Sequence, residues 1–324
     1  MSEVAILGDR LIEAYNLDEK FPIKPISGGI VNQTYLAQDK NGSKVIVQKL
    51  NSLFRSTVAD DRQYICEELS RALTVTPKMV ATAQGKSHHQ DGSDIWIASE
   101  WIDSDMNAEQ LTELTIGQIN SMGSLLREVH DALAEIDYTP KHKLPYFHDT
   151  RFYLARMNSM ASELDPEALL VSRQVANIFE DLQHLLEDTS VQIIHADAAV
   201  KNFLIKDNHP IAIIDFDTLM LGNKWIDIGD YIRSLIEWSN LRGVKLGRAH
   251  IEAFTEGYGQ GLDVQKPIEW AQLICSELSA RFLIDTIEDV YFDWDEDKFV
   301  SRKAHNIFRA KDQVAIHHTL NSLK

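Results

Sequence analysis

The feature that most constrains the fold is a pair of short apolar runs near the middle of the chain. The first, VQIIHAD, ends at Asp197, and the second, IAIIDF, carries Asp215 near its end. Asn202 lies between them and is the first residue of a third run, NFLI. Short apolar runs separated by turns are typical of buried strands. We therefore expect a hairpin that brings Asp197, Asn202 and Asp215 to one end.

These three residues form the pattern H-x-D-x-x-x-x-N followed by I-D-F-D. Phosphoryl transfer needs a carboxylate that orients the attacking hydroxyl and hard oxygen ligands that hold Mg²⁺ against nucleotide phosphates. Aspartates at strand ends also act as caps and turn formers, but that explains a single aspartate better than the whole pattern. We interpret Asp197 as the orienting group, and Asn202 and Asp215 as magnesium ligands.

Residues 1–102 read as a small β-rich lobe. An amphipathic helix within residues 1–20 precedes three period-two runs, FPIKPI, VNQTYLAQ and SKVIVQKL, and the Asn-Gly pair at 41–42 is a hairpin signal. A helix at about 58–73 and strands near 79–84 and 94–102 follow.

Residues 103–324 read as a mainly helical lobe. Apolar residues recur at helical spacing from Ile116 to Ile136 and from Val175 to Leu185. The chain has no internal repeat, low-complexity tract or flexible linker. The sequence therefore predicts an α+β fold whose two lobes share one interface.

A glycine-containing loop lies between the first two predicted strands. Gly28 and Gly29 allow backbone N–H groups to approach phosphate oxygens closely, and Asn32 and Thr34 are placed to brace the turn. Paired glycines are also common in ordinary hairpins, so the loop alone does not establish a phosphate site.

Lys49 ends the third predicted strand and is a candidate for contacting the nucleotide phosphates if a helix carboxylate holds it. Glu67 and Glu68 on the 58–73 helix are both candidates for that partner, and either is equally compatible with a solvated helix surface. Glu100 and Ile102 lie where the small lobe ends, and we expect their backbone groups to face adenine. An ordinary edge strand is the alternative for this segment.

Other acidic and histidine side chains surround the central motif. Asp227 is expected to hold the catalytic loop through its backbone N–H groups, although a helix N-cap is an equal alternative. His195, Asp217 and Asp230 are expected to support the site in the same indirect way.

Composition excludes some partners. The 324 residues include 49 acidic and 32 basic side chains, for a formal charge of −17, so most of the surface should repel nucleic acid and anionic membranes. Two cysteines do not make a disulfide framework, and no signal peptide or membrane span is evident. We expect a cytoplasmic protein.

The chain resembles the aminoglycoside phosphotransferase and choline kinase superfamily, and more closely its N-acetylhexosamine 1-kinase-like branch. The matching motifs are SGGxxNxTY, VQKLN, FHDT, HADAAVKN, IDFDTLMLG, IDIGDYIRS and RFLIDTIEDVYF. The resemblance implies a protein-kinase-like two-lobed fold, ATP and Mg²⁺ as cofactors, and a small-molecule hydroxyl as acceptor. It also implies Asp197 as the catalytic aspartate, Asn202 and Asp215 as magnesium ligands, and Lys49 as the phosphate lysine.

The chain departs from that branch beside the motif. Ala198 and Ala199 replace a Thr-Lys pair, and Leu221 replaces a proline. Lys201 is therefore a candidate for supplying positive charge to the transferring phosphoryl group, with a solvent-facing lysine as the equal alternative.

The resemblance favours a sugar acceptor, with an anomeric hydroxyl as the attacking group. The candidate acceptor-binding residues on the helical lobe are His148, Asp149, Arg281, Asp285 and Tyr291. Choline-like, homoserine-like and aminoglycoside acceptors remain open, as does a nucleotide-binding regulator without catalysis.

Overall fold

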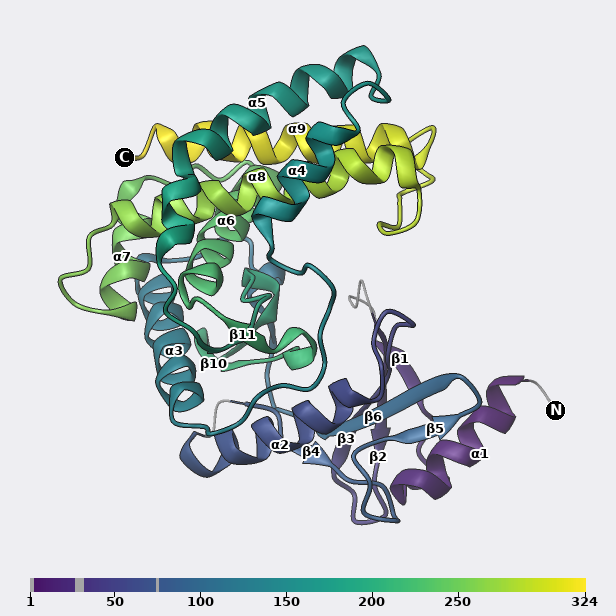
Figure 1. Cartoon of the computed structure of the whole chain (residues 1–324). Coiled ribbons are helices and arrows are strands. Elements are labelled where there is room, and N and C mark those ends of the chain that lie inside the picture. The colour runs from purple at the N-terminus through teal and green to yellow at the C-terminus, as the bar shows by residue number, and fades with distance from the viewer. Residues whose placement is uncertain (1–2, 27–31, 74–75) are drawn as a thin grey trace.

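A computed structural model of the chain describes residues 3–26, 32–73 and 76–324. Gly28 and Gly29 therefore lie outside the described residues. The N-terminal part is a small antiparallel sheet flanked by two helices, and the remainder is mainly helical (Figure 1). The predicted α+β class, with a small β-rich lobe and a larger helical part, is confirmed.

The small sheet has the strand order β1-β2-β3-β6-β4, with β5 paired to β6. Its elements, with helices α1 and α2, are α1 (Glu3–Tyr15), β1 (Lys24–Ile26), β2 (Gln33–Gln38), β3 (Lys44–Lys49), α2 (Thr57–Ala72), β4 (Met79–Val80), β5 (His89–Asp91) and β6 (Asp94–Glu100). Strand β5 lies between the strands predicted near 79–84 and 94–102, in a segment for which no strand was predicted. The β2–β3 turn follows the Asn-Gly signal: Gly42 has a φ of 89°, and Asp39 Oδ1 accepts hydrogen bonds from the N–H groups of Asn41 and Ser43.

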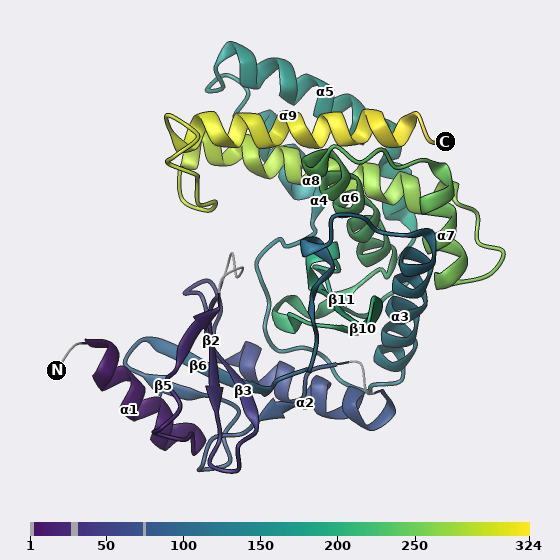
Figure 2. The same ribbon diagram turned by 180° about the vertical axis from the view of Figure 1, so that it is seen from behind.

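The larger part is built from helices that pack closely on one another (Figures 1 and 2). They are α3 (Ile116–Ala134), α4 (Thr150–Ser159), α5 (Pro166–Leu182), α6 (Trp225–Arg242), α7 (Arg248–Tyr258), α8 (Gln265–Glu288) and α9 (Arg302–Asn321). Thr115 and Gln118 form a capping box at the start of α3. Gly229 lets α6 approach α8, because a Cβ atom there would lie 2.8 Å from the Trp270 carbonyl carbon.

Five short strands lie between the small sheet and the helices. Strand β7 (Met106–Asn107) pairs with β9 (Phe203–Lys206), which forms a hairpin with β10 (His209–Ile213), and β8 (Gln192–Ile194) pairs with β11 (Met220–Gly222). Helix α3 lies beside β10 in both views (Figures 1 and 2).

The hydrophobic cores do not follow the boundary between sheet and helices. Leu11, Val45, Val47 and Trp96 belong to a core that joins α1 to one face of the sheet. Ile65, Cys66 and Leu69 of α2 instead belong to the large core of the helical part. Helix α2 is therefore anchored on the large lobe, although it lies between two strands of the small sheet in sequence.

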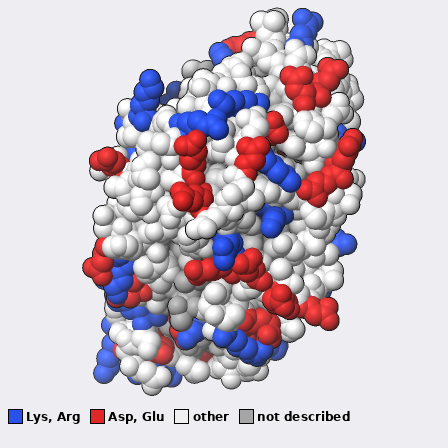
Figure 3. Space-filling view, turned by 90° about the vertical axis from the view of Figure 1, so that its left-hand side faces the viewer, with Lys and Arg blue, Asp and Glu red and all other residues white. Residues whose placement is uncertain are grey.

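The surface carries both signs of charge. On the face shown in Figure 3, basic and acidic side chains are interspersed among the described residues rather than gathered into one basic area. No helix in the described part of the chain is long and apolar enough to cross a membrane.

Candidate active site

The catalytic segment, residues 192–222, begins and ends in two strands that pair with each other. Strands β8 and β11 pair antiparallel, and between them the β9–β10 hairpin turns at Asp207 and Asn208, whose φ values of 48° and 66° suit a two-residue hairpin loop. Asp197 follows β8, Asn202 precedes β9, and Asp215 follows β10. The structure thus brings the three motif residues to one end, as the hairpin pattern predicted.

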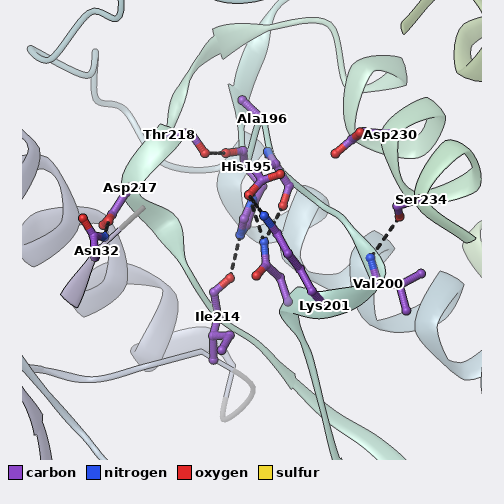
Figure 4. Close-up of polar contacts among 12 residues, drawn as sticks. Asn32, His195, Ala196, Val200, Lys201, Ile214, Asp217, Thr218, Asp230 and Ser234 are labelled. Carbon is purple, nitrogen blue, oxygen red and sulfur yellow. Dashed lines mark hydrogen bonds and ion pairs between the residues drawn. The ribbon is translucent and has the colours of Figure 1, made fainter. Parts of the chain in front are cut away.

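Asp197 lies in contact with Asn202 and Lys201. The Asn202 amide donates to the Asp197 backbone carbonyl at 2.7 Å and to its Oδ2 at 3.2 Å. Lys201 Nζ lies 3.1 Å from the same Oδ2, and both side chains are about one-third exposed, at 32% for Lys201 and 30% for Asp197. Figure 4 shows Lys201 extending toward the loop that carries His195 and Ala196. The Asp197 charge raises the pKa of Lys201 above its usual value, so Lys201 stays cationic in the cavity.

Asp215 is a partly buried carboxylate among other acids. Burial and the neighbouring carboxylates of Asp217 and Asp197 raise the pKa of Asp215 to about 6, and Lys201 and Arg62 oppose that increase. Its φ of 72° lies in the left-handed region, a backbone strain often found at functional sites.

Asp215 and Asn202 carry oxygen atoms of the kind that Mg²⁺ prefers as ligands. A divalent cation would offset the repulsion that raises the pKa of Asp215. No group of three His, Cys, Asp or Glu side chains in the described residues is arranged to bind a metal. Mg²⁺ does not need such a group, because it is commonly held by one or two carboxylates together with substrate phosphates and water.

Asp227 holds the loop before Asp197. Its Oδ2 accepts the His195 N–H at 2.8 Å and its Oδ1 accepts the Ala196 N–H at 2.7 Å. His130 Nε2 lies 2.8 Å from Oδ2, a contact that the sequence pattern did not suggest. The N-cap position of α6 is Lys224, so the geometry favours loop holding over the capping alternative for Asp227.

His195 links the two halves of the segment. Its Nδ1 accepts the Asp197 N–H at 3.2 Å, so the proton resides on Nε2, which donates to the Ile214 carbonyl at 2.9 Å (Figure 4). The Thr218 hydroxyl donates to the His195 carbonyl at 2.8 Å. The residues before Asp197 and before Asp215 are thereby tied to each other.

Asp230 and Asp217 are both buried and paired with arginines. Asp230 Oδ1 accepts a hydrogen bond from Arg233 Nε at 2.8 Å. Burial raises the pKa of Asp230 even though Arg233 opposes the shift. Asp217 accepts hydrogen bonds from Asn32 and Arg62, so it joins the small lobe to the end of the catalytic segment.

A cavity of about 370 Å³ lies between the small sheet and this segment. Its lining includes six residues predicted to bind nucleotide or metal, together with Lys201: Asn32, Thr34, Glu100, Ile102, Asn202 and Asp215. Asn32 accepts the Asn51 N–H at 2.9 Å, and Thr34 accepts a hydrogen bond from Gln48 at 3.4 Å.

The predicted pairing of Lys49 with Glu67 or Glu68 is wrong. Lys49 Nζ lies 2.5 Å from Asp94 Oδ2, whereas Glu67 and Glu68 both pair with Arg71 on their own helix. The physical reason is strand alternation, because successive side chains point to opposite faces of a sheet. Lys49 shares its face with the buried Val45 and Val47.

Ile46 and Gln48 occupy the opposite face of β3 and line the cavity. A buried arginine, Arg62 of α2, lies beside Gln48 at 3.3 Å and lines the same cavity. The sequence reasoning missed both Gln48 and Arg62. The alternation of Val45 and Val47 was the available signal, since it assigns the even-numbered residues to the other face.

His148 contacts the loop that precedes Asp197. Its Nε2 donates to the Ala196 carbonyl at 2.9 Å, and its Nδ1 lies 3.3 Å from Glu277 Oε1. Burial alone would lower the pKa of His148, but the Glu277 carboxylate outweighs it and holds that pKa above the usual value. Thr150 donates to the other Glu277 oxygen at 2.7 Å.

Arg281 lies next to Glu277 in an aromatic surround. Its guanidinium carbon is 5.2–5.6 Å from the centres of four rings, and one of its nitrogens donates to the Tyr291 hydroxyl at 3.0 Å. The four rings belong to Phe147, Tyr153, Tyr291 and Phe292. Glu277 thus contacts both His148 and Arg281, and Arg281 in turn contacts Tyr291, which makes one polar and aromatic cluster beside Ala196.

Asp149 and Asp285 differ from the expectation of direct acceptor contact. Asp149 is the N-cap of α4 and accepts the Phe152 N–H at 3.0 Å. The two Asp285 oxygens accept three backbone N–H groups of residues 290–292 and the Asn306 amide. Both carboxylates are engaged in holding loops, because the turns beside them leave backbone N–H groups that need acceptors.

A family profile described as the phosphotransferase enzyme family (APH) matches residues 22–268. Among solved structures, a microcompartment-associated aminopropanol kinase is similar with a TM-score of 0.70 and 15% identity, covering 99% of both chains. A spectinomycin phosphotransferase in complex with ADP and spectinomycin has a TM-score of 0.67 and 17% identity, also covering 99% of each chain.

An amicoumacin kinase in complex with AMP-PNP and Ca²⁺ has a TM-score of 0.66 and 15% identity, covering 97% of this chain and 94% of the other. At such identities these structures establish the fold alone. They confirm the kinase-like two-lobed architecture that the sequence predicted.

Proposed function

The chain belongs to the phosphotransferase enzyme family, and from this premise we propose that it transfers the γ-phosphoryl group of ATP to a hydroxyl of a small molecule. The observation that carries the proposal is that Asn202 and Asp215 line a cavity between the lobes and that Asp197 contacts Asn202 beside it. Phosphoryl transfer depends mainly on positioning and charge stabilisation, and these residues supply both.

The cavity suits a nucleotide lying between the lobes. In this proposal adenine packs against the connector at Glu100 and Ile102 and the phosphates point toward Asn202 and Asp215, because all four residues line the cavity. Neighbours solved with AMP-PNP and with ADP support nucleotide binding in this fold. Bound Mg²⁺ would neutralise phosphate charge, and Asn202 and Asp215 would hold it through oxygen atoms.

Asp197 is proposed to orient the acceptor hydroxyl and to accept its proton. Its partly exposed carboxylate suits that role, since a buried carboxylate would not reach an incoming hydroxyl. Lys201 is placed to offset negative charge on the transferring group, because it faces the cavity and remains cationic. Ala199 is buried and takes no part in this contact.

A sugar is the proposed acceptor, with the anomeric hydroxyl of an N-acetylhexosamine as the specific candidate. His148, Arg281 and Tyr291 supply polar groups and aromatic surface beside the loop that carries Asp197, a combination suited to a polar ring compound. The second candidate is a non-sugar alcohol. The names of the aminopropanol kinase and the spectinomycin phosphotransferase favour that alternative.

We also propose that residues 1–102 form the nucleotide-binding lobe and residues 103–324 the catalytic and acceptor-binding lobe. Strand β6 ends at Glu100, which supports a boundary there, although α2 packs on the larger lobe. A cytoplasmic location is consistent with Cys66 and Cys275, both of which are free thiols in separate elements.

The experiment is an acceptor panel with purified protein and Mg-ATP. Free hexosamines, neutral hexoses, choline, homoserine, aminopropanol and aminoglycosides are incubated separately, with ADP release as the assay and phosphorus NMR to locate the new phosphate. Turnover with a hexosamine at the anomeric position supports the sugar proposal. Turnover confined to a non-sugar alcohol contradicts it and leaves the kinase assignment in place, whereas no turnover with any acceptor favours a regulator without catalysis.

A further inference from the structure

Among the described residues that line the nucleotide cavity, two are basic: Lys201 and Arg62. Lys201 lies at the catalytic end, 3.1 Å from Asp197. Arg62 lies beneath the small sheet, beside Gln48. Nucleotide phosphates carry several negative charges, so a cation near the sheet would complete the binding site. Lys49 is on the other face of β3 and is paired with Asp94.

The guanidinium of Arg62 is buried and is held in place by hydrogen bonds that do not engage all of its N–H donors. Its side chain is 3% exposed, and it donates to Asp217 and to Gln48 Oε1, at 3.3 and 3.4 Å for the two terminal nitrogens that reach Gln48. Arg62 Nε is buried and has no hydrogen-bond acceptor among the residues that the structure describes. Because a guanidinium has five N–H donors in a fixed fork, Arg62 retains donors for a further anionic group.

Asp217 fixes the position of this guanidinium. It accepts from Arg62 through one oxygen and from the Asn32 amide through the other (Figure 4 shows Asn32 beside Asp217). Burial opposes the charge on Arg62, but Asp217 and other negative neighbours hold the pKa of Arg62 above its usual value. The guanidinium is therefore charged in the folded protein.

Helix α2 holds Arg62 on the same body as the proposed metal ligands. Ile65 and Cys66 pack in the core of the large lobe, and Asp61 accepts the backbone N–H groups of Lys141 and His142 at 3.0 and 2.7 Å. Arg62 is thus held next to the catalytic segment by contacts of its own helix with the large lobe.

We propose that Arg62, and not Lys49, is the cation from the N-terminal third that binds the nucleotide phosphates, with Asp217 positioning its guanidinium. The inference rests on the proposed function as an ATP-dependent phosphotransferase. The ligand class is a nucleoside di- or triphosphate. Gln48 takes the cavity-facing position on β3 and accepts from Arg62 instead of carrying the charge itself.

The test compares Arg62→Gln with the matched control Lys49→Met. The control also removes a cation from the N-terminal third of the chain, but one that does not line the cavity. Binding of adenosine, ADP and ATP, with Mg²⁺ present, is measured by isothermal titration calorimetry. We expect Arg62→Gln to weaken ADP and ATP binding at least tenfold, about 1.4 kcal/mol, and to change adenosine binding by less than about twofold. Lys49→Met should leave all three affinities within about twofold.

Three results would overturn the inference. The first is a selective loss of ADP and ATP binding in Lys49→Met. The second is an equal loss of adenosine binding in Arg62→Gln, which would indicate a structural role alone. The third concerns the double variant Gln48→Lys with Arg62→Gln, which returns a cation to the cavity face of β3 and should recover ADP affinity at least threefold over Arg62→Gln. Absence of that recovery would show that charge at this place does not bind phosphate.

Arg62→Lys decides the question if Arg62→Gln does not fold. It keeps the charge but loses the planar fork, so ADP and ATP affinity should fall at least threefold relative to adenosine, while Lys49→Met shows no such change. The reverse pattern overturns the inference. A wild type that binds none of the three ligands contradicts the proposed function as well, whereas a wild type that binds ATP and follows the reverse pattern contradicts this inference alone.

Discussion

Replacement of Asp227 by asparagine should loosen the loop that presents Asp197. The wild-type carboxylate accepts the Ala196 N–H at Oδ1, and the His195 N–H and His130 Nε2 at Oδ2. An asparagine has one oxygen, so its NH₂ group must face either the Ala196 N–H or the His195 N–H, donor against donor. A hydrogen bond to a charged group contributes about 1.5–3 kcal/mol, and a buried unpaired donor costs about 1–3 kcal/mol. We expect the free energy of unfolding to fall by about 2–4 kcal/mol.

The same change should lower turnover more than nucleotide binding. Ala196 has a φ of 64°, a left-handed conformation that costs about 1–2 kcal/mol for a residue with a Cβ atom, so the loop relaxes when its clamp is weakened. A displacement of Asp197 by about 1 Å is enough to cost about 10²-fold in rate. We expect kcat to fall about 10- to 100-fold, and the Kd for ATP to change by less than about twofold.

The assays are urea unfolding, steady-state kinetics with the acceptor found in the panel, and calorimetric ATP binding. Burial would raise the pKa of Asp227, but His130 and the loop N–H groups lower it below the usual value. Its stabilisation is therefore complete above the ordinary carboxyl pKa of about 4 and is lost as pH falls through the lower folded-state pKa. The wild type should lose more stability than Asp227→Asn on acidification through that range.

Asp181→Asn is the control, because it makes the same chemical change at an exposed residue of α5. Wild-type stability together with wild-type kcat in Asp227→Asn would refute the reasoning.

Three further predictions concern the catalytic segment itself. Asp197→Asn should lower kcat at least about 10²-fold with ATP affinity nearly unchanged, since orienting and basic groups contribute about 10²–10⁴-fold; wild-type turnover would contradict its role. Asp215→Ala should abolish the extra thermal stabilisation that Mg-ATP gives over ATP with chelator, and an undiminished magnesium increment in a thermal melt would place the metal elsewhere. Lys201→Met should lower kcat more than about tenfold, because about 1.4 kcal/mol of barrier is tenfold in rate; unchanged kinetics would leave its contact with Asp197 without catalytic effect.

Much of the central site could be predicted from the sequence because it is local. Asp197, Asn202 and Asp215 lie within one short segment, and apolar runs separated by turns are enough to indicate a hairpin that gathers them. Lys201 lies in the same segment, although the sequence did not indicate whether its side chain faces solvent or the cavity. In the structure the side chain lines the cavity and contacts Asp197.

The partners of that segment come from distant elements, and the sequence did not identify them. His130 of α3 contacts Asp227 of α6, and Glu277 of α8 contacts His148, pairs separated by about a hundred residues or more. No spacing rule relates such residues. The loop-holding contacts of Asp285 were not predicted for the same reason, since the turn that bonds to its carboxylate forms only when residues 290–292 fold back on α8.

Period and turn chemistry act over a few residues, so the sequence was sufficient to predict the fold class, the division into a small β-rich part and a mainly helical part, and the meeting of Asp197, Asn202 and Asp215. Only the tertiary structure decided which cation enters the nucleotide cavity. Alternation along β3 turned Lys49 toward Asp94, and the packing of α2 on the large lobe brought Arg62 to Asp217. Alternation along a strand decides which face of the sheet a side chain lies on. Which residue it contacts there depends on which helix packs against that face, and this is set by distant parts of the chain.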